Sequence, residues 1–178
     1  MQCIYRVIAE DAFMLKPPTS ATHRTYWLSV PDGRSVGDTV GNIIGDIYTK
    51  GDKLDQLQLL GHGDYGVMTI GEDWDAKSIA PMRLLKTYFV DMASGIQLLG
   101  CGVASSTSIR SGKRIVLGAF SVSGAGYQLM RTMAMHTGVC VEAGIHVQVQ
   151  DPWYDIEGPA IRVYPDGTWE NFMGGSTT

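Results

Sequence analysis

The two stretches that decide the fold are LQLLGHG at residues 57–63 and IQLLGCG at residues 96–102. Each begins with a short apolar run and leads into a glycine, which is typical of a strand buried on both faces of a parallel sheet. Between them, residues 78–94 carry apolar side chains at helical spacing after a serine that can cap a helix. A helix is the usual crossover between neighbouring parallel strands.

The rest of the chain predicts further elements of the same kind. Strands are expected at 3–8, 25–30, 67–70 and 139–149, helices at 36–50 and 125–136, and a hairpin around the Pro-Asp-Gly turn within 160–172. This order indicates a three-layer α-β-α sandwich around a mainly parallel sheet, with a C-terminal β-hairpin. We therefore predict one α/β domain over residues 1–172 and a disordered tail at 173–178.

The first predicted helix contains three glycines spaced four residues apart, Gly37, Gly41 and Gly45. Each costs about 1 kcal/mol relative to alanine in a helix interior. We expect these glycines to form a face on which the helix packs closely against the sheet.

Composition excludes several classes of function. The chain has 178 residues, of which 44% are hydrophobic and 18% charged, as in soluble globular domains. A net charge of -4 predicts neither nucleic-acid nor membrane binding. Arg6, Glu10 and Asp11 interrupt the first apolar stretch, so it does not read as a signal peptide, and a cytoplasmic location is expected, with signal-less export left open. Three widely spaced cysteines argue against a disulfide framework and a metal site.

A histidine and a cysteine follow the two central strands. His62 comes after LQLLG and Cys101 after IQLLG. Reactive groups gather beyond the carboxyl ends of parallel strands, so neighbouring strands would bring a thiol nucleophile and its base together. Flanking glycines would let each chain turn off the sheet, and Gly63 and Gly102 would let a substrate backbone approach.

The order of these motifs resembles the caspase-like cysteine peptidases of clan CD, which include caspases, gingipains, clostripain and legumain. In that group one strand ends in His-Gly and a later strand ends in a small residue and a cysteine. HGDYG, GCGVA and HTGVCVEAG also resemble a bacterial domain family of unknown function that is thought to share this fold. The resemblance covers about residues 54–144. It implies Cys101 as nucleophile, His62 as general acid/base, an oxyanion hole from the backbone N–H groups of Gly63 and Cys101, and no metal or organic cofactor.

The chain also departs from the caspases. Caspases carry a glutamine where this chain has Leu99, and their arginine set for aspartate has no counterpart here. Aspartate specificity is therefore not expected. The loop at 103–123 carries Arg110, Lys113 and Arg114 and is a candidate for self-cleavage or for contact with an acidic partner, while ordinary solvated loop charge is the alternative.

Other reactive residues have competing interpretations. Asp64 and Glu142 could form a pocket for a basic substrate residue, or they could be solvated carboxylates. His136 and His146 follow the cysteine, as in papain-like and NlpC/P60-like enzymes, but that arrangement needs the cysteine at a helix N-terminus, and GCGVASSTS leads into a loop. The other two cysteines, Cys3 and Cys140, are expected in the core.

Together these features predict a cysteine endopeptidase that uses a His62–Cys101 dyad on a protein or peptide substrate. Two alternatives stay open. One is a non-catalytic caspase-like module for binding or assembly, and the other is a thiol amidase or transpeptidase that acts on cell-wall peptides. The sequence leaves open whether the chain is a monomer or a homodimer.

Overall fold

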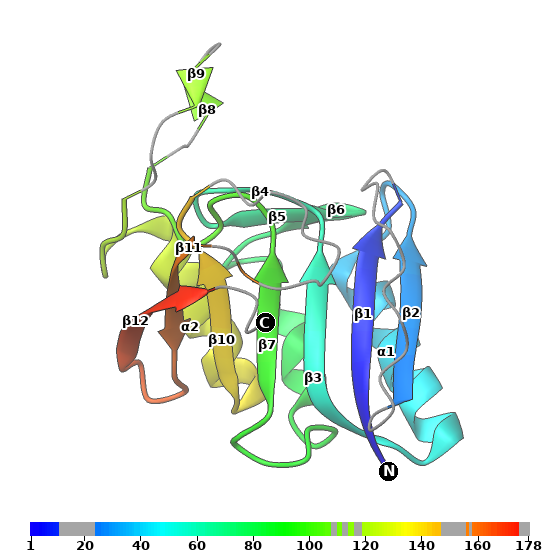
Figure 1. Cartoon of the computed structure of the whole chain (residues 1–178). Coiled ribbons are helices and arrows are strands. Elements are labelled where there is room, and N and C mark those ends of the chain that lie inside the picture. Colours follow the sequence, from blue (N-terminus) through cyan, green and yellow to red (C-terminus); the bar gives the residue numbers. More distant parts are fainter. Residues whose placement is uncertain are drawn as a thin grey trace.

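The computed structural model describes residues 1–10, 24–107, 119–146 and 158–174, Ile156, and the backbone of Arg110, Ser111, Arg114 and Ile115. Seven strands of this part of the chain form one sheet (Figure 1). In order across the sheet they are β12 (Trp169–Gly174), β11 (Gly158–Val163), β10 (Cys140–Gly144), β7 (Gly95–Leu99), β3 (Lys53–Leu60), β1 (Gln2–Ala9) and β2 (Arg24–Val30).

The sheet is mainly parallel. β2, β1, β3, β7 and β10 run parallel to one another, whereas β11 and β12 are antiparallel. This confirms the α/β class and the mainly parallel sheet. The predicted C-terminal hairpin is also present, with Gly167 at φ +85° in its turn. Because β12 extends to Gly174, Met173 and Gly174 belong to the hairpin rather than to the predicted tail.

The helices described here cover one face of the sheet (Figure 1). They are α1 (Val36–Lys50), the 3₁₀ helix η1 (Ala80–Leu85) and α2 (Ala125–Thr137). Their buried side chains form one apolar cluster with alternate residues of the strands, for example Val7, Leu57 and Leu98. The three-layer arrangement is not confirmed, because none of the described helices covers the other face, where a second, smaller cluster around Leu60 and Leu99 lies.

Local sequence signals account for both α-helices. The Ser35 hydroxyl accepts a hydrogen bond from the Asp38 amide (3.1 Å) at the start of α1, and Gly51 ends that helix in the left-handed conformation. Gly138, at φ +78°, ends α2 in the same way. Both helices therefore lie where the sequence predicts them.

The predicted helix over 78–94 was wrong in type and in length. Ser78 does not cap a helix, because its hydroxyl interacts with the turn at Asp75. Only the six residues of η1 are helical. The chain then extends, and the backbone of Tyr88 and Val90 hydrogen-bonds to Leu54 of β3 (2.8 and 2.9 Å). This pairing with β3 competes with helix formation.

Two small sheets lie outside the main one. β4 (His62–Asp64), β5 (Val67–Ile70) and β6 (Glu72–Trp74) form an antiparallel sheet across the carboxyl edge of the central strands, on the helix side (Figure 1). β8 (Arg110–Ser111) and β9 (Arg114–Ile115) form a short pair in the loop after Cys101. The charged side chains of that loop, together with His23 and Trp153, lie outside the described residues.

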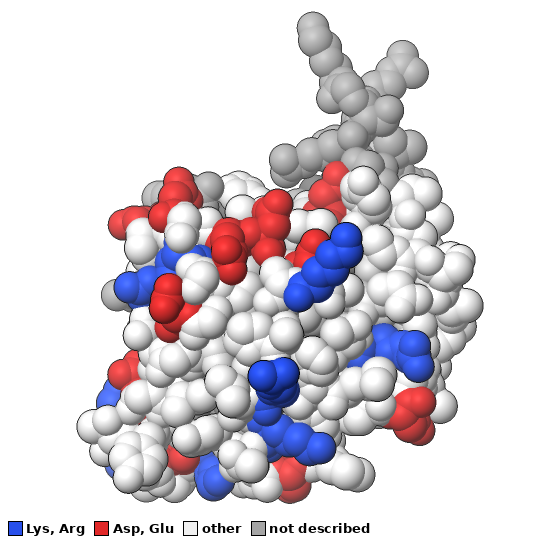
Figure 2. All heavy atoms as spheres, turned by 180° about the vertical axis from the view of Figure 1, so that it is seen from behind, with Lys and Arg blue, Asp and Glu red and all other residues white. Residues whose placement is uncertain are grey.

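The glycines of α1 do not pack against the sheet, contrary to the prediction. Gly37, Gly41 and Gly45 are exposed, and a Cβ atom added at Gly41 or Gly45 would meet nothing within 4 Å. Val40 and Ile43 occupy the sheet-facing side of the helix instead. Figure 2 shows the helix-covered side of the molecule, where much of the surface carries no charged side chain. In the described residues, no helix is long and apolar enough to cross a membrane.

We predict that Gly41→Ala and Gly45→Ala each stabilise the protein by about 1 kcal/mol, because alanine favours the helix and meets no obstacle at either position. Urea unfolding followed by circular dichroism measures the change. Gly51→Ala is the matched control and is expected to destabilise by about 1 kcal/mol, because Gly51 has φ +65°. A loss of stability in the helix variants would contradict the prediction.

Candidate functional site

The two reactive motifs lie at the same edge of the sheet. β3 and β7 are parallel neighbours, and Leu60 pairs with Leu99. Counting two residues onward from that pair gives His62 and Cys101. The Gly61 amide still reaches the Leu99 carbonyl at 3.5 Å, so the two chains remain side by side as they leave the sheet. The predicted neighbourhood of the two strands is therefore present.

Backbone contact holds the two motifs together beyond the strands. A Cβ atom on Gly63 would lie 2.6 Å from Val103 Cγ2 and 2.9 Å from the Cys101 carbonyl oxygen. A Cβ atom on Gly100 would lie 3.1 Å from the Gly61 carbonyl oxygen and 3.3 Å from Gly63 Cα. The glycines at 61, 63 and 100 have φ outside the left-handed region, so close packing between the loops is what requires them.

Cys101 begins a tight turn that neighbouring segments hold in place. On one side the Gly66 amide, in the β4–β5 turn, donates to the Val103 carbonyl (3.0 Å). On the other side the Gly102 amide donates to the His146 carbonyl (2.8 Å). Gly102 itself adopts φ +58°. Because its N–H is used inside the fold, Gly102 is not available to bind an oxyanion through that group.

Within this arrangement His62 is exposed and belongs to β4, where it pairs with Thr69. Cys101 is half-buried. The loops of the two residues are in contact through their backbones, and both side chains have some access to solvent.

His146 is a second histidine beside Cys101. Ala143 of β10 pairs with Leu98 of β7, so counting three residues onward places His146 opposite Cys101. The hydrogen bond from the Gly102 amide to the His146 carbonyl confirms this neighbourhood. His62 and His146 therefore flank the cysteine on its two sides. The sequence did carry a signal for His146, because HTGVCVEAGIH predicts a strand that follows a helix and ends near this histidine. His146 was the weaker candidate because it follows the cysteine in the chain.

Of the proposed substrate-binding residues, Asp64 and Gly102 lie at this edge, whereas Glu142 does not. Asp64 is in β4 and accepts a hydrogen bond from the Tyr65 amide (3.1 Å). Glu142 is in the middle of β10 and pairs with Gln97 of β7, four residues before Cys101. Its carboxylate binds the Arg162 guanidinium, with a shortest N–O distance of 2.5 Å. It cannot join Asp64 in one pocket, because four residues of a strand span roughly 13 Å.

Glu142 belongs instead to a row of polar side chains that crosses the face of the sheet opposite the described helices. Each member hydrogen-bonds to the next, from Arg6 to Gln58 (2.5 Å), Gln58 to Gln97 (2.8 Å), Gln97 to Glu142 (3.1 Å), Arg162 to Glu142 (2.7 Å) and Arg162 to Glu170 (2.7 Å). The Arg6 guanidinium also lies over the Trp27 ring, 4.9 Å from its centroid. We call these six hydrogen-bonded residues together with Trp27, one residue from each strand, the polar ladder. Charge alternates along it, since Arg6, Glu142, Arg162 and Glu170 carry opposite signs in turn.

The other two cysteines are poor candidates for a nucleophile. Burial raises the pKa of Cys3 to about 11, and the Asp52 carboxylate adds to the effect. Burial and Glu142 also raise the pKa of Cys140. Both thiols therefore remain protonated at neutral pH. Cys3 is fully buried, as predicted, but Cys140 is only partly buried and lines a hollow on the face of the sheet opposite the helices.

Among the described residues, no group of three or more His, Cys, Asp and Glu side chains could hold a metal ion. No family model, curated protein or solved structure matches the chain.

We predict that Gly63→Ala destabilises the protein by about 1–3 kcal/mol, because the new methyl group would overlap Val103 and the backbone of Cys101. It should also change the rate at which iodoacetamide alkylates Cys101, measured by peptide mass spectrometry. Gly41→Ala, which meets no neighbour, is the control and should leave that rate unchanged. An unaltered fold and alkylation rate in Gly63→Ala would contradict the close contact.

Proposed function

We propose that the chain is a cysteine endopeptidase in which Cys101 is the nucleophile and His62 the general acid/base. The observation that carries the proposal is the parallel pairing of Leu60 with Leu99, which brings the loops of His62 and Cys101 into backbone contact. A second observation supports the choice of thiol, since burial raises the pKa of Cys3 and of Cys140 and so favours their protonated, less nucleophilic form. The proposal includes a caspase-like architecture, with its three layers, on the strength of the motif order.

In the proposed reaction, His62 takes the proton of the Cys101 thiol. The thiolate then attacks the peptide carbonyl carbon, and the C–N bond breaks as His62 returns the proton to the leaving amine. The carbonyl carbon is left as a thioester on Cys101, which a water molecule hydrolyses with His62 as base. The backbone N–H groups of Gly63 and Cys101 would bind the oxyanion.

Protein labelling tests the nucleophile. The reagents are peptidyl acyloxymethyl ketones that differ in the residue next to the reactive ketone, and intact mass counts the adducts. We expect one adduct on the wild type and none on Cys101→Ala. Cys140→Ala is the matched control and should label like the wild type, because burial keeps that thiol protonated. An adduct that persists on Cys101→Ala would refute the proposed nucleophile.

The same assay identifies the base. His62→Ala is expected to slow labelling of Cys101 by about 10²–10⁴-fold, the usual contribution of general acid–base catalysis. His146→Ala should slow it by less than about tenfold, because His146 would not transfer the proton. The reverse order of effects would assign the base to His146 and show that the site uses the papain-like order.

Two outcomes would favour the other classes of function. A Cys101 that reacts with iodoacetamide no faster than a small free thiol indicates a non-catalytic binding or assembly module. A reactive Cys101 that releases fragments from purified cell wall, but cleaves no peptide in a substrate library, indicates a thiol amidase.

A further inference from the structure

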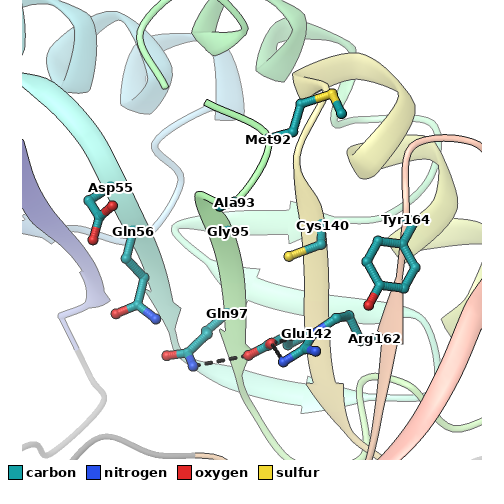
Figure 3. A pocket seen from close by; sticks show the side chains of 10 residues that line it. All are labelled: Asp55, Gln56, Met92, Ala93, Gly95, Gln97, Cys140, Glu142, Arg162 and Tyr164. Atoms are coloured by element: carbon teal, nitrogen blue, oxygen red, sulfur yellow. Dashed lines mark hydrogen bonds and ion pairs between the residues drawn. The ribbon is translucent and has the colours of Figure 1, made fainter. Parts of the chain in front are cut away.

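The face of the sheet opposite the described helices carries a hollow of about 420 Å³ (Figure 3). It lies beside the polar ladder, over the amino-terminal parts of β3, β7 and β10, far from Cys101. Its lining includes Asp55, Gln56, Gly95, Cys140 and Tyr164, together with three members of the polar ladder. A cavity of this volume is in the range that holds small molecules.

Gly95 creates this hollow. Gln56, Gly95 and Cys140 form one transverse row across β3, β7 and β10. The row faces away from the helices, and its middle position has no side chain. A Cβ atom on Gly95 would lie 3.2 Å from Cys140 Sγ, tighter than most contacts of that kind. The floor of the hollow is therefore bare backbone between two strands that do carry side chains.

One wall of the hollow is held rigid. Gln97, Glu142 and Arg162 of the polar ladder stand in the next row, and Figure 3 shows their hydrogen bonds. The Arg162 guanidinium also lies over the Phe172 ring, 5.1 Å from its centroid. These polar groups are held before any ligand arrives. Glu142 accepts from Gln97 and Arg162 and, like any carboxylate, retains further lone pairs for a ligand hydroxyl.

The lining suits a hydroxyl-rich ligand. Glu142 is neutralised by Arg162, and the other carboxylate of the lining, Asp55, can accept hydrogen bonds from ligand hydroxyl groups. Polar groups on both sides of the floor, Gln56 and Gln97, disfavour an apolar ligand. Amides and carboxylates instead suit neighbouring hydroxyl groups, which both donate and accept, and the Tyr164 ring can cover an apolar ring face. We propose that this hollow is a binding site for a monosaccharide or a short oligosaccharide.

Titration of the full chain with glucose, galactose, mannose, N-acetylglucosamine and a disaccharide, followed by amide NMR shifts, tests the proposal. At least one sugar should shift the amides of Gly95, Gln97 and Cys140 with a dissociation constant on the order of 1 mM, as expected for a small polar ligand. Absence of such shifts for every sugar would overturn the proposal, as would saturable binding of a small amine in place of the sugars.

Variants separate the hollow from other surfaces. Gly95→Val fills the floor with a side chain that strands favour and should weaken sugar binding at least about tenfold. Gln56→Ala should also weaken sugar binding, and this variant leaves both the floor and the ladder intact. It therefore tests the binding site even if Gly95→Val does not fold. Gly41→Ala, on the helix side, is the control and should bind like the wild type. Equal binding by Gln56→Ala and the wild type would place the sugar elsewhere.

Discussion

The parallel register of β3, β7 and β10 determines both polar features of the molecule. It aligns Gln58, Gln97 and Glu142 in the middle of the sheet, and four residues later it brings His62 and Cys101 to one edge. Because side chains alternate between faces, a slip of one residue would turn the glutamines into the apolar core beneath the helices. One register therefore supports the hydrogen bonds of the ladder and the arrangement of the edge together.

Two independent requirements specify that register. On the helix side, Leu57, Leu59 and Leu98 must be buried. On the side opposite the helices, Gln58 is only 4% exposed, and its amide hydrogen-bonds with Arg6 on β1 and Gln97 on β7. A buried amide without hydrogen bonds costs about 1–3 kcal/mol. A shifted register would lose apolar burial on one face and leave amides unpaired on the other, so both faces favour the same pairing.

The sequence predicted what depends on local pattern and missed what depends on distant partners. Ser35, Gly138 and the two apolar runs of β3 and β7 carry their own signals, and these elements lie where expected. Segment 86–90 did not become a helix, because it pairs with Leu54, more than thirty residues earlier. The partner of Glu142 is Arg162, from a hairpin that no local pattern connects to β10. The exposed glycines of α1 could have been recognised, since they lie beside the apolar stripe of Val36, Val40, Ile43 and Ile47 rather than on it.

The ladder also bears on the chemistry of the edge. Side chains cross-link the central strands one after another, roughly four residues below the loops of His62 and Cys101, so these loops start from strands held about 4.8 Å apart. Backbone contact between Gly63 and the Cys101 turn continues that spacing beyond the sheet. Proton transfer between a thiol and an imidazole needs the two groups within hydrogen-bonding reach and loses rate steeply when they move apart. A rigid sheet beneath two glycine-packed loops would therefore supply the positioning that the proposed His62–Cys101 dyad requires.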